Sequence, residues 1–313
     1  MDLAAHLERP ELAGAMLCWN MNPAASNPEQ VRLRQALARN DLFTVVIDLF
    51  QTDTADYADV VLPAASFLEF DDLVSSYFHL SLGAQAKAVD PPGEALPNSE
   101  IFRRFAAALG YTEPALFEPD RAVIETILAR SGLGVTWEEL VERGTVWVSE
   151  EPRVQFPERV FPTPSGRVEL ASTTAAGDGH GRTPLPVSDP RPADGRLRLL
   201  SPASPWLMNT SFANDRKISK RIGKPTIGLH PDDAAERGLC EGQRACVQSH
   251  TGELTLLVTI TDIVPPGVAY TQKGRWPKID DSAANVNALV PGRKSDMGES
   301  TSLHATEITV TAL

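Results

Sequence analysis

The N-terminal third of the chain combines short apolar runs with a strong helix-start signal. Residues 28–39 are predicted to form a helix, because Pro28 suits the first helical position and Ser26 or Asn27 can cap it. The runs on either side are apolar and partly β-branched, which is typical of parallel strands buried on both faces. These runs cover residues 14–19, 43–47 and 60–62. The order strand, helix, strand predicts a right-handed β-α-β unit.

Further helices are predicted over residues 98–109, 120–130 and 136–142. Asn98 or Ser99 can cap the first of them, and Thr136 can cap the last. About three parallel strands are fewer than a doubly wound sheet normally has. We therefore expect the N-terminal half to be the second part of an α/β domain whose first part is absent.

The pattern changes near residue 196. Short β-type runs separated by turns predict a mostly β barrel. The runs cover residues 197–200, 244–248, 254–261, 268–271 and 307–311. Residues 173–195 are rich in Gly, Pro, Thr and Asp and are expected to be a linker. The predicted fold is a partial doubly wound parallel-sheet α/β domain at 1–172, then a β-barrel domain at 196–313.

Polar residues follow the predicted strands, at the edge where open α/β sheets bind ligands. Asp48 ends the strand at 43–47, and a carboxylate there can accept two hydrogen bonds from a guanine edge or from ribose hydroxyls. The turn at 20–23 lies at the same edge, and a helix N-terminus there can receive a phosphate. The alternatives stay open: Asp48 and Thr52 can simply satisfy a turn, and the 20–23 turn can be a plain connection.

Two loops of the C-terminal half have candidate chemistry. Residues 201–212 follow a strand and concentrate Ser, Thr and Asn donors around Trp206, which suits pyrophosphate and heterocycle polar atoms. Residues 272–304 are long, polar and Gly-punctuated, which in a compact domain favours a functional loop. An ordinary polar loop is the alternative for the first, and His304 by itself is more safely structural.

Composition excludes several classes of function. The formal net charge of −12 makes a nucleic-acid backbone a poor partner. No apolar stretch is long enough to span a bilayer and no signal peptide opens the chain, so a cytoplasmic location is expected. The three cysteines form no CxxC pair, which argues against disulfide, zinc and iron–sulfur frameworks. No GxGxxG follows a strand, which disfavours a nicotinamide-dependent dehydrogenase.

Longer motifs are more specific than this periodicity. Residues 48–63 read DxFxTxTAxxADVVLP, residues 163–172 read TPSGRVEL followed by Ser172, and residues 295–304 read SDxGxSTSxH. These resemble segments of the molybdopterin oxidoreductases, the superfamily of dimethylsulfoxide reductase and formate dehydrogenase. The resemblance implies that the C-terminal barrel is a double-psi β-barrel and that the cofactor is a molybdopterin guanine dinucleotide with molybdenum or tungsten.

The resemblance also implies cofactor contacts. Asp48 and Thr52 would contact the guanosine, the 201–212 loop would embrace the pterin, and Asn287 would meet pterin or guanine. A simple N-cap is an equal alternative for Asn98. The residues implied as cofactor-binding are Asn20, Asn22, Asp48, Thr52, Asn98, Ser204, Asn209, Ser211, Asn287, Asp296, Ser302 and His304. The GTxxN-like segment of many family members reads LVSSYFHLSLGAQ here, so no residue between Asp71 and Gln85 is assigned.

The sequence contains no CxxCxxxC run and no position that matches the family's metal ligand. No catalytic residue is assigned, and any iron–sulfur cluster would be bound by an absent upstream region. The favoured interpretation is the C-terminal, cofactor-positioning portion of a two-electron oxidoreductase. Its expected partners are an upstream half, in the same polypeptide or as a separate subunit, and an electron-transfer subunit. The alternative is a non-catalytic module of a redox complex, like that of the respiratory complex I large subunit, which keeps the fold without the metal cofactor.

Overall fold

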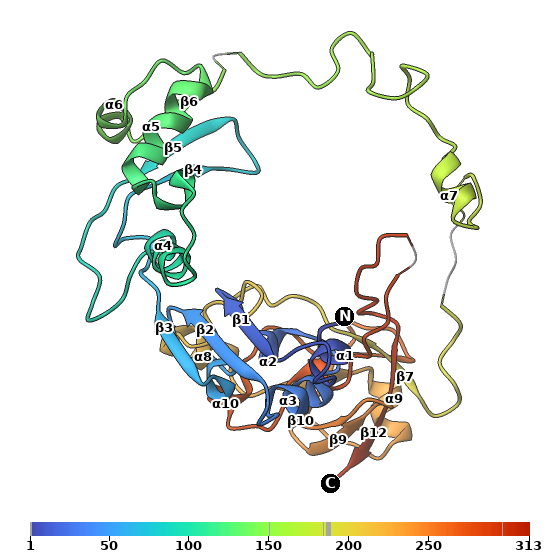
Figure 1. The fold of residues 1–313 in the computed structure, drawn as a ribbon. Coiled ribbons are helices and arrows are strands. Elements are labelled where there is room, and N and C mark those ends of the chain that lie inside the picture. Colours follow the sequence, from blue (N-terminus) through green and yellow to red (C-terminus); the bar gives the residue numbers. More distant parts are fainter. Residues whose placement is uncertain (1, 150, 184, 186–188, 296) are drawn as a thin grey trace. The chain divides into compact units, whose positions relative to one another are not determined.

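The computed structural model describes residues 2–149, 151–183, 185, 189–295 and 297–313 (Figure 1). The chain forms two compact units, and both are discontinuous in sequence. The first, here called the barrel unit, contains residues 1–46, 51–61 and 171–313. The second, the hairpin unit, contains residues 47–50 and 62–170. The predicted linear division at 172 and 195 stays a prediction.

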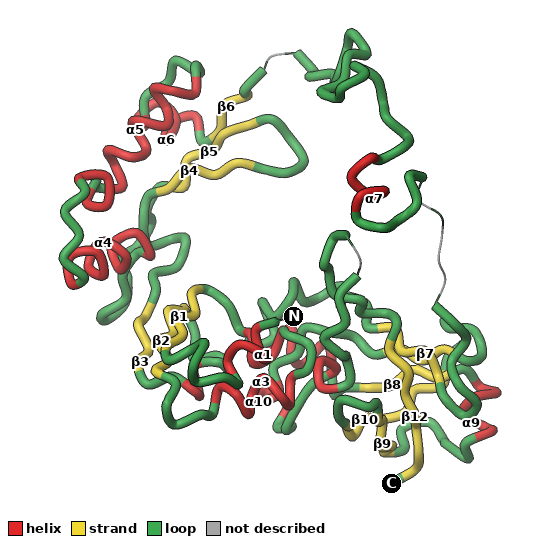
Figure 2. The backbone as a smooth tube through the Cα atoms, turned by 45° about the vertical axis from the view of Figure 1, so that its right-hand side comes forward, coloured by secondary structure: helices red, strands yellow, loops and turns green. Residues whose placement is uncertain are grey.

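The barrel unit contains short helices and a β-barrel (Figure 2). Its helices, including the 3-10 helices η1 and η3, are α1 (Leu3–Leu7), α2 (Pro23–Ser26), α3 (Gln30–Leu37), η1 (Ala55–Tyr57), α7 (Thr173–Gly177), α8 (Arg216–Ile222), α9 (Pro231–Glu236), α10 (Pro277–Asp280) and η3 (Val286–Ala288). Its strands are β1 (Ala15–Trp19), β7 (Leu197–Leu200), β8 (Thr226–Leu229), β9 (Arg244–Gln248), β10 (Glu253–Ile260), β11 (Val268–Tyr270) and β12 (Thr306–Ala312).

A three-stranded sheet has the order β1-β2-β3, with β2 at Phe43–Asp48 and β3 at Val60–Pro63. Asp59 donates its N–H to the carbonyl of Thr44, and Ala64 donates to that of Asp48. Both bonds advance along β2 and β3 in the same direction, so these two strands are parallel. The three strands predicted from the apolar runs are therefore present.

The helix predicted at 28–39 starts later than expected, at Gln30, so its predicted start is wrong. The chain instead forms α2 and then α3, which are separated by Glu29 in the left-handed region at φ 50°. The N–H of Glu29 donates to the carbonyl of Val290 at 2.9 Å, a partner more than 250 residues away. Neither Ser26 nor Asn27 caps α3, because this tertiary bond fixes the backbone that a local cap would have shaped.

The barrel closes in the order β10-β8-β11-β7-β12-β9. The pairs β10–β8 and β11–β7 are parallel, and the other pairs are antiparallel. Leu197, Leu199, Ile227 and Leu229 alternate inward and are 0 or 1% exposed, which is the pattern of a packed small barrel. A Cβ on Gly228 would lie 2.1 Å from the Tyr270 ring, so only glycine fits in β8 at this point. The predicted mostly β barrel is confirmed.

The hairpin unit contains strands β4 (Asp72–Ser75), β5 (Ser81–Gln85) and β6 (Thr145–Trp147), in the order β4-β5-β6. Its helices are α4 (Asn98–Ala108), η2 (Pro114–Phe117), α5 (Asp120–Ser131) and α6 (Trp137–Arg143). The three predicted helices are present, and Thr136 and Glu139 form a capping box at the start of α6. The small sheet was not predicted. Within the described residues, no helix is long and apolar enough to cross a membrane.

Candidate functional site

The turn after β1 and the turn after β2 are bonded together by Asn22. Its Oδ1 accepts from the backbone N–H of Thr54 at 3.1 Å and from the Thr54 hydroxyl at 2.9 Å. Asn22 is 4% exposed, whereas Asn20 is exposed with a φ of 50°. Thr52 is also buried, and its hydroxyl accepts from Ala55 N–H at the start of η1. Asn22 and Thr52 therefore fix the backbone of the two turns. Asn20 is the residue of the three that faces solvent.

Asp53 is the ionic centre beside these turns. Its Oδ1 accepts from Arg34 Nη2 at 2.9 Å and from the backbone N–H of Lys278 at 3.1 Å. The Asp53 side chain is 3% exposed and that of Arg34 18%. The Lys278 ammonium reaches Asp56 at 2.6 Å and the carbonyls of Gln51 and Thr52. The sequence analysis missed Asp53, because its partners come from α3 and from the start of α10.

A network of buried amides joins α2 and α3 to the loop that precedes η3. Gln30 exchanges two hydrogen bonds with Asn285: its Oε1 accepts from Asn285 N–H at 2.9 Å and its Nε2 donates to Asn285 Oδ1 at 3.2 Å. Asn285 and Asn287 both donate through Nδ2 to the carbonyl of Ala25 at 2.8 Å. All three polar side chains are less than 9% exposed. The side-chain amide of Asn287, a predicted cofactor residue, therefore donates a hydrogen bond to the protein itself.

The first residue of the 201–212 loop, Ser201, has a hydroxyl without a partner among the described residues. Ser201 is 2% exposed. Its N–H donates to His304 Nδ1 at 3.3 Å, which brings the start of this loop to the end of the 272–304 loop. Ser204 is buried and accepts from Trp206 N–H at 3.2 Å. Ser201 was not among the predicted contacts, although its position directly after β7 offered the signal.

The outer part of this loop is held by the opposite loop. Trp276 Nε1 donates to the carbonyl of Thr210 at 2.6 Å. A Cβ on Gly274, which has a φ of 102°, would lie 2.2 Å from the carbonyl oxygen of Asn209. Asn209 itself has a φ of 53°, and both Asn209 and Ser211 are exposed. The loop thus presents these two predicted polar side chains to solvent.

Three predicted residues come from the last loop. Ser302 is half-buried and donates its N–H to the carbonyl of Arg293 at 3.0 Å. His304 is exposed and contacts Ser201 as described above. Asp296 lies outside the described residues. The structure therefore associates His304 directly with the 201–212 loop, and Ser302 with its own loop.

In the hairpin unit, the segments that contain Asp48 and Asn98 both bond to residues 64–65. The carbonyl of Asp48 accepts from Ala64 N–H, and Ala65 donates to the carbonyl of Leu96, just before α4. The Asp48 carboxylate is half-buried and accepts from Phe50 N–H at 3.1 Å. Burial raises the pKa of Asp48, and backbone hydrogen bonds oppose this rise in part.

Asn98 is the first residue of α4 and does not act as its cap, since Pro97 occupies that position. The Oδ1 atom of Asn98 is buried and has no partner among the described residues. An acceptor in this state is costly unless a ligand donor satisfies it. The cap predicted as an alternative role is therefore wrong for Asn98, and its oxygen is left for another donor.

The barrel unit also has a surface hollow of about 880 Å³. It is lined by Arg244, Cys246, Thr255, Gln272, Asp280 and Asn285, among others. None of the described residues predicted as cofactor contacts lines it. Burial raises the pKa of Asp280 at its wall, while the Arg275 guanidinium at 3.1 Å opposes the rise.

The unpaired polar atoms of Ser201, in the barrel unit, and of Asn98, in the hairpin unit, each suit a polar group of an organic ligand. Ser201 Oγ can donate or accept, and Asn98 Oδ1 can accept. Among the described residues, no group of His, Cys, Asp and Glu side chains has the arrangement that holds a metal ion. Each of these two atoms can therefore hydrogen-bond a heterocycle or sugar within its own unit, and no described acid–base pair assigns a chemical step.

Two family models match the chain. The molybdopterin oxidoreductase family matches residues 2–108, and the molybdopterin dinucleotide binding domain matches residues 197–307. The chain is 34% identical to the probable oxidoreductase YoaE of Bacillus subtilis, over 91% of this chain and 42% of that protein. It is 27% identical to the catalytic chain of a putative dimethyl sulfoxide reductase of Halobacterium salinarum, over 91% of this chain and 35% of that one.

A solved structure shares the fold. Acetylene hydratase from Pelobacter acetylenicus aligns with a TM-score of 0.84 and 21% sequence identity, over 99% of this chain and 46% of that chain. The chain thus spans less than half the length of each of these relatives. The matched families confirm the predicted cofactor, a molybdopterin guanine dinucleotide with molybdenum or tungsten.

Proposed function

Because this chain belongs to the molybdopterin oxidoreductase superfamily, we propose that it is the C-terminal, cofactor-positioning portion of a molybdenum or tungsten oxidoreductase with a bis-molybdopterin guanine dinucleotide. In this proposal, residues 1–172 supply part of a doubly wound α/β domain and residues 196–313 a double-psi barrel. The two parallel pairs in the otherwise antiparallel barrel support the second assignment.

One observation carries the proposal. Segments that are far apart in sequence and that resemble the family's cofactor loops are bonded to one another inside the barrel unit. Asn287 bonds to Ala25 next to the 20–23 turn, and Ser201 bonds to His304. Both contacts bring a predicted cofactor segment to another one, and the hydroxyl of Ser201, in the second contact, remains unpaired within the described chain.

The proposal gives the described residues different tasks. Asn20, Asn209 and Ser211 are exposed and would contact the ligand directly, together with the Ser201 hydroxyl. Asn98 and Asp48 would bind the guanine nucleotide, where a carboxylate can accept two hydrogen bonds from the base. Three of the other predicted residues, Asn22, Thr52 and Asn287, would fix the backbone that holds these contacts. The bound cofactor would supply the two-electron redox chemistry at its metal.

Titration of the recombinant chain with purified molybdopterin guanine dinucleotide tests this function. We expect saturable binding, measured by quenching of tryptophan fluorescence, by the chain alone or with an upstream half supplied in trans. Ser201→Ala and Asn98→Leu should each weaken binding about tenfold, the effect of losing one good hydrogen bond. Asn40→Ala, a change at an exposed asparagine, is the matched control and should leave binding unchanged.

Absence of binding in both arms, with the fold intact by circular dichroism, would contradict the proposal. That result would favour the non-catalytic module, which keeps the fold without the cofactor. The upstream half, an electron-transfer partner and a cytoplasmic location all belong to the proposal. A multi-chain organisation in the family supports the partner, since the Halobacterium salinarum relative is named as a catalytic subunit.

A further inference from the structure

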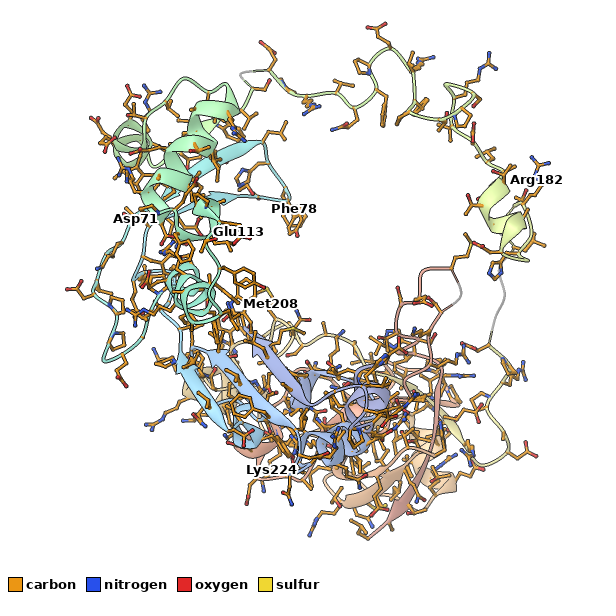
Figure 3. The ribbon with its side chains drawn as sticks, in the orientation of Figure 1. Asp71, Phe78, Glu113, Arg182, Met208 and Lys224 are labelled. Atoms are coloured by element: carbon orange, nitrogen blue, oxygen red, sulfur yellow. The ribbon has the colours of Figure 1, made fainter. Side chains whose placement is uncertain are left out.

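Helix α8 in the barrel unit concentrates positive charge on an acidic chain. Arg216, Lys217, Lys220 and Arg221 lie in its seven residues, and Lys224 follows it; all five are exposed. None forms an ion pair with another described residue, whereas the chain as a whole has a formal net charge of −12. We call these five residues the α8 basic patch, and Figure 3 labels Lys224 at its end.

Helix stability does not explain this patch. Cations in the last turn, such as Lys220 and Arg221, are favoured by the helix dipole. Arg216 and Lys217 lie in the first turn, where the same dipole opposes them. Arg216 and Lys220 are also four residues apart, as are Lys217 and Arg221, and like charges at this spacing destabilise a helix. The helix dipole and the repulsion between like charges therefore both disfavour this arrangement of cations.

The opposite face of α8 is fixed to the unit. Ile218 and Ile222 pack against the buried cluster of Leu207, Ala213 and Trp276. The Asp215 carboxylate caps the helix by accepting from two backbone N–H groups at 2.8 and 2.9 Å. The basic side chains are thus presented on a rigid helix rather than on a mobile tail.

One exposed aromatic side chain, Trp206, borders the patch, and the same loop exposes Met208 and Phe212. The Arg221 guanidinium stacks 3.8 Å from the centroid of the Trp206 ring, a geometry that orders both side chains. Trp206, Met208 and Phe212 are 39, 63 and 54% exposed. Arg, Trp, Phe and Met are the residue types enriched at the centre of protein–protein interfaces. A cationic stripe beside exposed aromatic residues fits a folded protein with an acidic surface.

We propose that the α8 basic patch docks an acidic protein, the electron carrier of the redox reaction. The nature of this carrier rests on the proposed function, but the docking surface rests on the charge and exposure of α8. At an ionic strength near 0.1 M the Debye length is about 10 Å, so the local cations dominate at contact although the net charge of the chain is negative. Such steering acts mainly on the association rate and falls with salt.

The test uses the full chain and a small acidic [2Fe–2S] ferredoxin as the probe. Binding is measured by calorimetry or surface plasmon resonance between 20 and 300 mM salt. Lys217→Glu combined with Lys220→Glu should weaken binding about tenfold or more at low salt and flatten the salt dependence. This variant leaves the Arg221–Trp206 stack intact. Arg130→Glu combined with Arg143→Glu is the control, since both arginines are exposed in the last turns of α5 and α6.

The outcomes separate the possibilities. No ferredoxin binding, or an equal loss in the control variant, would overturn the docking proposal. Binding to phosphatidylserine vesicles in place of ferredoxin would assign the patch to a membrane surface and overturn it as well. Loss of cofactor affinity with unchanged ferredoxin affinity would instead assign the cations to the cofactor phosphates. Cofactor titration of the same variants keeps a failure of the proposed function distinguishable, because the two ligands are measured separately.

Discussion

The buried amides of the barrel unit and of the hairpin unit differ in how their hydrogen bonds are satisfied. In the barrel unit, Gln30, Asn285 and Asn287 satisfy one another and the carbonyl of Ala25. In the hairpin unit, Asn98 Oδ1 and Gln85 Nε2 are buried without a partner in the described chain. The first set holds distant segments together, while the second set retains hydrogen-bonding capacity.

This difference distinguishes buried polar groups that hold the fold together from those that are free to bind a ligand. A buried polar group that is already bonded contributes to specificity of the fold and has little left for a ligand. An unsatisfied one costs free energy in the free protein, and that cost is recovered when a ligand binds. Substitution should therefore lower stability in the first set and lower affinity in the second.

Gln30→Ala should give the largest loss of stability. The change leaves the N–H of Asn285 unpaired at a site where Gln30 is 0% exposed, and it opens a cavity. We expect the free energy of unfolding to fall by about 3 kcal/mol, as measured by urea denaturation. Gln35→Ala, at an exposed position of the same helix, should change it by less than about 0.5 kcal/mol. Equal effects of the two variants would refute the structural role of the network.

Asp53→Ala should have the next largest effect. It removes a carboxylate whose side chain is 3% exposed and leaves the guanidinium of Arg34 with one bond fewer. Because Arg34 keeps its bonds to the carbonyls of Ala24 and Ala283, we expect a loss of about 2 kcal/mol. Asp56→Ala breaks an exposed ion pair of the same region and should cost about 0.5 kcal/mol. Thermal or urea unfolding of both variants provides the comparison.

Asn98→Ala in the hairpin unit and Ser201→Ala in the barrel unit test the unpaired atoms of the comparison. Each removes a buried atom that has no partner among the described residues, so stability should stay within about 1 kcal/mol of the parent or rise. Cofactor affinity should nevertheless fall about tenfold. Ser204→Ala is the matched change, because the Ser204 hydroxyl already accepts from Trp206 N–H. A loss of stability from Asn98→Ala larger than that from Ser204→Ala would show that Asn98 helps to hold the fold together.

Asp48→Asn should have the smallest effect on stability, and its sign depends on pH. Since burial raises the pKa of Asp48, the folded chain keeps this proton to a higher pH than the unfolded chain. Ionisation of Asp48 therefore lowers stability as pH rises from the ordinary aspartate range through the folded pKa. The variant removes this fall and should gain a few tenths of a kcal/mol near pH 7, because solvent screens a half-buried group.

Urea midpoints of the parent and the variant between pH 4 and 7 measure this effect. Asp90 provides the opposite sign, because its hydrogen bond with Lys87 lowers the pKa of Asp90 and stabilises the folded chain as pH rises. Parallel pH curves for the parent and Asp48→Asn would mean that Asp48 ionises in the folded chain as it does in the unfolded chain.

Elements with strong local signals were predictable from the sequence. Five of the six strands of the described barrel lie in the short β-type runs that the sequence predicts, and Thr136 marks the start of α6 with its capping box. Strand β8 was not predicted; it reads TIGL, and a glycine inside a strand weakens its β propensity. The sheet of β4, β5 and β6 was missed because β6 pairs with β5 from far along the chain.

The candidate site was predictable where a motif marks it and unpredictable where distant partners build it. The resemblance pointed to Asn22, Thr52 and Asn287, which also bond to Thr54, Ala55 and Ala25; their contact with a cofactor stays a prediction. Gln30, Arg34 and Asp53 had no local signature. Their partners lie as far as 255 residues away, which no local pattern can encode.

The separation between Gln30 and Asn285 sets an order of events during synthesis. A ribosome that adds 5–20 residues per second needs roughly 13–50 s to make the 255 residues between them. Throughout that interval the partner that buries Gln30 has not been made, so its amide hydrogen bonds to Asn285 cannot form. Assembly of the barrel unit is therefore a late event, so the cell can complete it only after translation has passed the last loops.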